Sequence, residues 1–274
     1  MQYDENKPNY YVCTFSGGKD STAMLLKLIE DGKHIDEVIN YDTTVEFPAM
    51  YEHIERVKAV VEEAGVKFTT LRYKQSFEYI MLDREIHSRS GEILRGYGWA
   101  KSNQRWCTGY LKRDLANKYV GDLRKKYNVY FYVGLAYDEG ERLQRVNNTD
   151  WSQLHPLVDY EMTEADCLRY CYDLGYDWGG LYEHFSRTSC WCCPLQSLDD
   201  LRVLYHNFPE LWNKLKDWDS KVRGMKFKDV GVPFLEARFN LEDERIAQGL
   251  TINSHTKEFR EALKELKESF CSEE

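Results

Sequence analysis

Two adjacent glycines join an apolar strand to a helix near the start of this 274-residue chain. The segment 10–13 (YYVC) leads into the run 14–22 (TFSGGKDST), and an apolar helical stretch follows from Ala23. A buried strand that passes through glycines and hydroxyls into a helix aims backbone N–H groups and the positive end of the helix dipole at one point. The run therefore predicts a site for a phosphate or sulfate group.

Each residue type in this run suits an anion. Gly17 and Gly18 allow positive φ and leave no Cβ in the way of the ligand. Lys19 adds a positive charge, and Ser21 and Thr22 add hydroxyl donors. The spacing S-G-G-K-D-S-T differs from the Walker P-loop, G-x-x-x-x-G-K-S/T. The alternative interpretation is a capped strand–turn–helix junction that binds no ligand.

Strands and helices alternate through the first half of the chain. A helix begins at Pro48 and ends at Gly65. Strands are predicted over 10–15, 37–41, 67–73 and 129–134. Such alternation predicts βαβ units, and the expected fold class is α/β: a Rossmann-like parallel sheet flanked by helices.

The second half of the chain is expected to be mainly helical. A weak boundary near 149–156 divides the chain into a nucleotide-binding α/β domain, 1–150, and a helical C-terminal region, 151–274, which carries a cysteine cluster. Helices are predicted over 163–175, 198–205, 209–222 and 259–270.

Three polar clusters follow predicted strands, at 16–22, 42–44 and 134–142. In parallel sheets, ligands bind beyond the carboxyl ends of the strands. We therefore expect these clusters to meet at one edge of the sheet.

Charge gives a mixed indication about partners. The net charge of −9, from 37 basic and 46 acidic residues, argues against a strongly basic nucleic-acid binder. Residues 84–126 nevertheless contain eleven Lys or Arg and four Asp or Glu. That segment could neutralise a nucleotide or contact an RNA backbone, and its alternative is a solvated helical face.

The sequence shows neither an apolar run of membrane-spanning length nor a signal-like N-terminus. We therefore expect a cytoplasmic protein without a membrane partner, and a homodimer is among the expected assemblies. The eight cysteines are then expected to be reduced rather than paired in disulfides.

Three thiols fall within four positions in the segment 189–194 (SCWCCP). Cys190 and Cys193 have the C-x-x-C spacing that lets two thiolates share one metal ion. Cys192 and the more distant Cys107 are candidates to complete the ligand set. Thiolates select zinc or an iron–sulfur cluster, and we favour the cluster. The alternative is a group of buried, reduced thiols.

The glycine run resembles the PP-loop of the ATP pyrophosphatase superfamily, in the form found in the phosphoadenosine phosphosulfate (PAPS) reductase family. The segment 42–48 (DTTVEFP) resembles that family's DTG…FPE segment, where adenosine is held, with Thr44 in place of the glycine. The resemblance covers residues 10 to 215. It implies an adenine-nucleotide site formed by Ser16, Gly17, Gly18, Lys19, Asp20, Ser21, Thr22, Asp42 and Thr43.

The same resemblance extends to a third segment and to the cysteines. Residues 134–142 (GLAYDEGER) resemble the family's G-I-x-x-D-E-x-x-R, which implies that Arg142 reaches a phosphate. Members with a 4Fe–4S cluster use a Cys-Cys pair about eighty residues before a C-x-x-C. Here Trp106 and Cys107 occupy the place of the pair, so tryptophan replaces one of its cysteines. Cys107 precedes Cys190 by 83 positions. The ligands implied are all four candidate cysteines, or three with one open iron.

Two reactions fit such a scaffold. In a sulfonucleotide reductase, a cysteine thiolate attacks the sulfur of PAPS or adenosine phosphosulfate (APS). In those enzymes the nucleophilic cysteine lies in a C-terminal Glu-Cys-Gly-Leu/Ile-His segment. The tail 267–274 (KESFCSEE) lacks that motif.

In the reaction we favour, ATP with Mg²⁺ adenylates an acceptor, and sulfur then displaces AMP. Lys19, Asp20 and Arg142 are its expected catalytic residues, with Asp20 orienting the metal. The acceptor is RNA, DNA or a small molecule. A non-catalytic nucleotide-binding subunit of a sulfur-modification complex is the remaining alternative.

Overall fold

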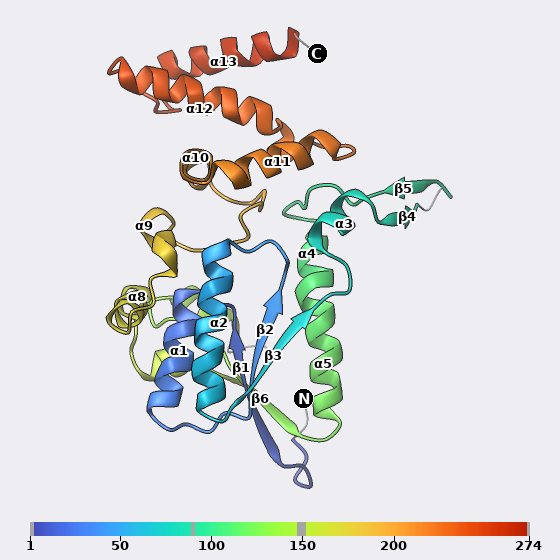
Figure 1. The fold of residues 1–274 in the computed structure, drawn as a ribbon, viewed down its shortest axis with the longest axis vertical. Coiled ribbons are helices and arrows are strands. Elements are labelled where there is room, and N and C mark those ends of the chain that lie inside the picture. The colour runs from blue at the N-terminus through green and yellow to red at the C-terminus, as the bar shows by residue number, and fades with distance from the viewer. Residues whose placement is uncertain (1–2, 89–90, 147–151, 273–274) are drawn as a thin grey trace. The chain divides into compact units, whose positions relative to one another are not determined.

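A parallel five-stranded sheet forms the centre of the N-terminal part of the molecule, confirming the α/β fold class (Figure 1). The computed structural model describes residues 3–88, 91–146 and 152–272. The sheet has the order β3-β2-β1-β6-β7. Its strands are β1 (Asn9–Phe15), β2 (Glu37–Asp42), β3 (Lys67–Arg72), β6 (Asn128–Tyr132) and β7 (Gln153–Leu154).

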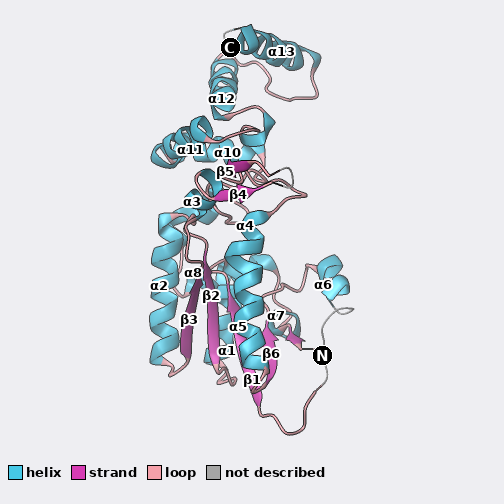
Figure 2. Cartoon of the chain, turned by 90° about the vertical axis from the view of Figure 1, so that its right-hand side faces the viewer, coloured by secondary structure: helices cyan, strands magenta, loops and turns pink. Residues whose placement is uncertain are grey.

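Helices cover both faces of this sheet. Helices α1 (Lys19–Glu30) and α2 (Pro48–Glu63) lie on one face, and α5 (Asp114–Arg124) lies on the other (Figures 1 and 2). Each of α1 and α2 connects two adjacent parallel strands, as a βαβ unit requires. Strand β1 is central, because the chain continues to β2 on one side of it and later returns as β6 on the other.

The core of this part follows from the alternation of side chains along each strand. Val12, Ile39 and Val129 are buried on one face of three neighbouring strands, and Tyr119 and Leu123 of α5 pack against them. On the opposite face, Cys13 of β1 and Val38 of β2 are also fully buried, as strands covered on both faces require.

The chain divides into two compact units whose bounds differ from the expected domains. The first comprises Met1–Phe77 and Trp106–Cys190, and the second comprises Glu78–Arg105 and Trp191–Glu274. The boundary predicted at residue 150 lies outside the described residues. Strand β7 extends the sheet and α8 (Glu164–Asp173) packs on α1, so residues 152–190 still belong to the first unit.

Short helical segments complete the first unit. The π-helical turn η1 leads directly into α5, and η2 precedes α9. The segments are α4 (Trp106–Thr108), η1 (Gly109–Arg113), α6 (Gly140–Val146), α7 (Pro156–Asp159), η2 (Trp178–Gly180) and α9 (Leu181–His184).

The second unit is mainly helical and contains one antiparallel hairpin, β4 (Glu85–His87) with β5 (Ile93–Arg95). Helices α10, α11 and α13 confirm three predicted segments. The helical segments are α3 (Phe77–Leu82), α10 (Leu198–Asn207), α11 (Pro209–Lys221), η3 (Phe227–Asp229), α12 (Val232–Ala247) and α13 (Lys257–Ser272). Among the described residues, no helix combines the length and apolar character that a membrane crossing needs.

Helix α12 was not predicted from the sequence. Its buried face includes Glu242, which is fully buried and forms ion pairs with Arg202 and Arg238. A charged residue on the inward face interrupts the apolar stripe on which a periodicity argument depends.

Candidate functional site

The glycine junction lies at the carboxyl end of β1, where the strand passes into α1. Gly17 has φ of +84°, and a Cβ there would lie 2.7 Å from Met50 Sδ, so this position requires glycine. Ser21 Oγ accepts a hydrogen bond from the Ser16 N–H at 3.2 Å and lies 3.0 Å from Ser16 Oγ. The two hydroxyls therefore lie together at the start of α1.

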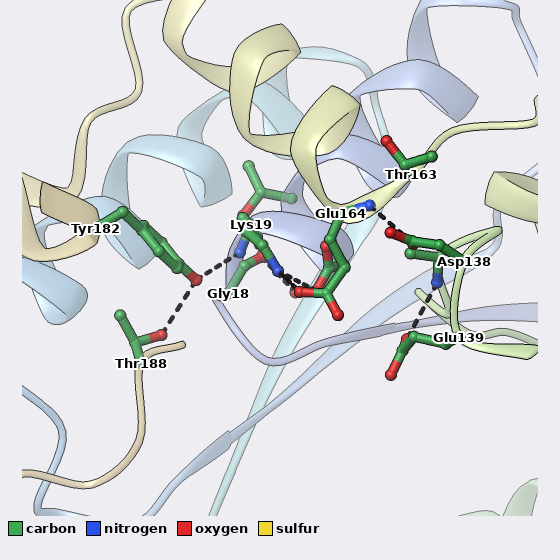
Figure 3. A network of polar contacts seen from close by, with 12 residues as sticks. Gly18, Lys19, Asp138, Glu139, Thr163, Glu164, Tyr182 and Thr188 are labelled. Atoms are coloured by element: carbon green, nitrogen blue, oxygen red, sulfur yellow. Dashed lines mark hydrogen bonds and ion pairs between the residues drawn. The ribbon is translucent and has the colours of Figure 1, made fainter. Parts of the chain in front are cut away.

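Lys19 is the buried cation of this junction (Figure 3). Its ammonium donates to Glu164 Oε2 at 2.5 Å and to Asp20 Oδ2 at 3.1 Å, and its backbone N–H donates to the Tyr182 hydroxyl at 2.8 Å. Burial opposes the charged form, but the hydrogen bonds and attraction from Glu164 and Asp20 outweigh it and raise the Lys19 pKa. The Lys19 side chain is therefore protonated at neutral pH and is flanked by the Asp20 and Glu164 carboxylates.

Asp20 supplies an acceptor that has no partner. Burial raises the pKa of its carboxyl, against the opposing effect of Lys19. Its Oδ1 atom is buried and has no hydrogen-bond partner among the described residues. A carboxylate oxygen is the kind of ligand that Mg²⁺ prefers, so this atom fits the predicted role of Asp20 in orienting the metal.

The loop after β6 forms a second wall. A Cβ at Gly134 would lie 2.9 Å from the Ser21 Cα and 3.0 Å from the Ser21 N, so the backbone of this loop touches the backbone of the first turn of α1. Farther along, Asp138 Oδ1 accepts from the Glu164 N–H at 3.0 Å (Figure 3). The loops meet beside the central strand, where the strand order reverses and open α/β sheets bind ligands.

Arg142, the residue implied to reach a phosphate, is exposed on α6. Its Nη1 donates to Glu139 Oε1 at 2.8 Å, and Glu139 Oε2 accepts from the Ala136 N–H at 3.1 Å. Arg142 is thus tied to the loop after β6 through Glu139.

The polar cluster after β2 lies beside one of the candidate cysteines. Thr43 Oγ1 donates to Glu46 Oε1 at 2.7 Å, and the Cys190 thiol donates to the same oxygen at 3.5 Å. Asp42 Oδ1 accepts from the Thr44 N–H at 2.8 Å. Thr44 adopts φ of +67°, a left-handed conformation that is uncommon for a β-branched residue.

The four candidate cysteines are divided between the units. Cys107, in α4, and Cys190 belong to the first unit, whereas Cys192 and Cys193 belong to the second. Across residues 3–88, 91–146 and 152–272, no group of three or more His, Cys, Asp or Glu side chains is placed to hold a metal ion. The described residues therefore do not display an assembled cluster site.

Buried residues from other elements support the glycine junction. His53 Nε2 lies 2.9 Å from Thr22 Oγ1, and the His53 ring packs on Trp178 with centroids 4.5 Å apart. The Trp178 Nε1–H donates to the Gly17 carbonyl at 2.7 Å. Burial lowers the His53 pKa to about 4, so this histidine is neutral at physiological pH.

The stability of the fold should therefore depend on pH through His53. An unfolded histidine titrates near pH 6.5 and the folded one near pH 4, so the unfolded state binds more protons between these values. Stability should fall by up to about 3 kcal/mol as the pH drops from 6.5 to 4. Denaturant unfolding across this range should show that the free energy of unfolding falls with decreasing pH in the wild type and in His255→Gln. The fall should be shallower in His53→Gln. Equal slopes in all three proteins would contradict the assignment.

Glu164 competes with any anion for the Lys19 ammonium. Its side chain is 45% exposed, so its ion pair with Lys19 is screened and contributes about 0.5–1 kcal/mol. Glu164→Gln should therefore raise the affinity for metal-free ATP by roughly 2- to 5-fold, measured by calorimetric titration. Glu30→Gln on α1 is the control. Weaker binding by Glu164→Gln would show that Glu164 assists the ligand instead.

Sequence reasoning missed four residues of this site: His53, Glu164, Tyr182 and Thr188. The Tyr182 hydroxyl lies 3.2 Å from Thr188 Oγ1 as well as accepting from Lys19 (Figure 3). The segment from Thr163 predicted the start of a helix, and the structure shows a capping box there. That signal placed Glu164 in a first helical turn and did not indicate its contact with Lys19.

The fold and this junction define an α/β protein with a candidate anion-binding site at the end of β1. A search of protein-family models found no match. An uncharacterised protein of Methanocaldococcus jannaschii is 26% identical over 226 residues, which cover 76% of this chain and 40% of that protein. The chain thus spans less than half the length of this relative.

The solved structure of the U34-tRNA thiolase NcsA from Methanococcus maripaludis, with its 4Fe–4S cluster, is similar with a TM-score of 0.41 and 15% identity. The match covers 94% of this chain and 79% of that one.

Proposed function

We propose that this chain is a PP-loop enzyme that uses ATP to activate an acceptor for sulfur transfer. An oxygen of the acceptor attacks the α-phosphate of ATP, and pyrophosphate leaves. A sulfur nucleophile then attacks the acceptor carbon that carries the adenylated oxygen. The bond between that carbon and the oxygen breaks, and AMP leaves with the oxygen. The observation that supports this proposal most directly is the buried Lys19 ammonium at the first turn of α1, where the backbone of the loop after β6 touches that turn.

The residues of the junction suit the first step. Charge accumulates on the pyrophosphate as it leaves, and a fixed, desolvated cation stabilises that charge more than water does. Lys19 supplies the cation, and the Ser16 and Ser21 hydroxyls supply donors next to it. The unpartnered Asp20 Oδ1 would hold Mg²⁺, which supplies further positive charge to the phosphates when bound.

Two further groups of residues keep their sequence-based roles within this proposal. Asp42 and Thr43 are proposed to contact the nucleotide at the end of β2, and Arg142 to contact a phosphate after release from Glu139. Cys107, Cys190, Cys192 and Cys193 are proposed ligands of an iron–sulfur cluster, with zinc as the alternative. Metal and acid-labile sulfide analysis of anaerobically purified protein tests them, with Cys167→Ala as the control for each ligand variant.

The products distinguish the proposed reaction from its alternatives. Incubation with Mg-ATP and candidate acceptors should release pyrophosphate and AMP, which phosphorus NMR resolves from ADP and phosphate. Release of sulfite from PAPS or APS with a thiol reductant would instead identify a sulfonucleotide reductase. Nucleotide binding without turnover on RNA, DNA or small-molecule acceptors would support a non-catalytic subunit.

A further inference from the structure

The second unit contains a cavity of about 270 Å³ that none of the roles above uses. Three segments line it: 99–103, 194–195 and 225–229, without the buried Phe227. All three belong to the second unit, and residues 194–195 directly follow the candidate ligands Cys192 and Cys193. Its volume lies just below the usual range of small-molecule sites.

The wall of this cavity carries three lysines and one carboxylate: Lys101, Lys226, Lys228 and Asp229. The Lys226 ammonium donates to the Asp219 backbone carbonyl at 2.8 Å. The Lys228 ammonium donates to the Pro194 and Gln196 carbonyls at 3.1 and 2.8 Å. Within the described part of the chain, none of the three lysines forms an ion pair, and neutral carbonyls position two of them. Three cations against one carboxylate leave the wall with a net positive charge.

The rim is fixed before any ligand arrives. Lys228 and Asp229 have φ of 50° and 68°, a left-handed conformation that is strained for residues other than glycine. The buried Asp219 carboxylate holds this turn, because Oδ1 accepts from the Phe227 N–H at 2.7 Å and Oδ2 from the Val232 N–H at 2.8 Å. A strained turn held by a buried carboxylate therefore fixes the position of Lys226 and Lys228 on the cavity wall.

The cavity also has an apolar wall. Leu195 and Met225 are exposed apolar side chains on the cavity wall, and Trp99 and Ala100 are buried beneath it. A thioether and an aliphatic side chain offer a flat, polarisable ring a contact surface. Cationic and apolar walls in one cavity of this size fit a group that is anionic at one end and aromatic at the other.

We propose that this cavity binds one nucleotide unit, with its phosphate against the lysines and its base against Leu195 and Met225. The unit is either a free mononucleotide or part of a single-stranded nucleic acid. Binding here does not require Lys19. The further interpretation of the cavity as the subsite for the sulfur acceptor rests on the proposed function and on the adjacent cysteines.

The test uses the full chain with Lys19→Ala, which removes the nucleotide-loop lysine from the measurement. The probes are uridine monophosphate and a labelled single-stranded RNA of about twelve nucleotides. Lys101 makes no side-chain hydrogen bond among the described residues, so Lys101→Glu changes the charge with little structural risk. It should weaken binding of at least one probe by about tenfold or more. For RNA, the slope of log affinity against log salt should also fall by about 1.

Lys264→Glu on α13 is the matched control and should change either affinity less than about twofold. Leu195→Ala should weaken binding without changing the salt slope, which separates the base contact from the charge. If Lys101→Glu weakens the binding of uridine monophosphate, the ligand is a free nucleotide. If Lys101→Glu weakens only the binding of RNA, the ligand is the polymer. Absence of binding by both probes, or equal effects of Lys101→Glu and Lys264→Glu, would overturn the proposal. Neither result depends on ATP turnover.

Discussion

Lys19→Ala should weaken Mg-ATP binding by roughly 10- to 100-fold, because a hydrogen bond between charged groups contributes about 1.5–3 kcal/mol. The loss should exceed that of an exposed lysine, since Lys19 is 6% exposed and lies between two carboxylates. Without the ammonium, Asp20 and Glu164 would both repel the phosphates. Isothermal titration calorimetry measures the effect directly.

Lys27→Ala provides the matched control for this substitution. Lys27 lies on the same helix and forms ion pairs with Glu30 and Asp31, at 2.9 and 3.7 Å, on a more exposed surface. Its removal should change ATP affinity less than about twofold. Equal losses from the two variants would indicate a general effect of charge and would contradict a specific role for Lys19.

Gly134→Ala should both destabilise the protein and weaken nucleotide binding. The new Cβ would approach the Ser21 Cα at 2.9 Å and the Asp20 backbone carbon at 3.1 Å, and backbone atoms cannot rotate away. Overpacking of this kind costs about 1–3 kcal/mol, and the loops must separate to relieve it. Denaturant unfolding measures the first effect and calorimetry with Mg-ATP the second.

Gly121→Ala gives the opposite expectation with the same chemical change. Gly121 lies within α5, and a Cβ there would meet no atom within 4 Å. Alanine in a helix should stabilise the protein by about 0.5–1 kcal/mol and leave ATP affinity unchanged. Destabilisation by both alanines, or neither, would contradict the backbone contact described for Gly134.

The sheet and the glycine junction could be predicted because their signals are local. The apolar run 10–15 followed by Gly17 and Gly18 fixed a strand, a tight turn and a helix within about 20 residues. The order of strands and helices then placed the polar loops at one edge of the sheet. Contact between the junction and the loop after β6 confirms this placement, since Gly134 abuts Ser21.

The partners of the junction could not be predicted, because they come from distant parts of the chain. Glu164 is 145 residues from Lys19, and Tyr182 is 163 residues away. A glutamate in a first helical turn is ordinary, and a tyrosine in a short helix such as α9 gives no signal for a contact so distant in the chain. The positive φ of Thr44 could not be predicted either, because a threonine gives no local signal for that conformation. The division into units also depends on long-range packing of two separate segments.

We expect an adenine nucleotide to bind at the junction between β1 and α1. Chemical-shift mapping of isotope-labelled full-length protein tests it most directly, with Mg-ATP added stepwise. We expect the largest changes in the backbone amides of residues 16–22 and of the loop from Gly134 to Asp138, with little change in Lys19→Ala. Unchanged amides at both loops, with changes elsewhere or none, would contradict the assignment of this site.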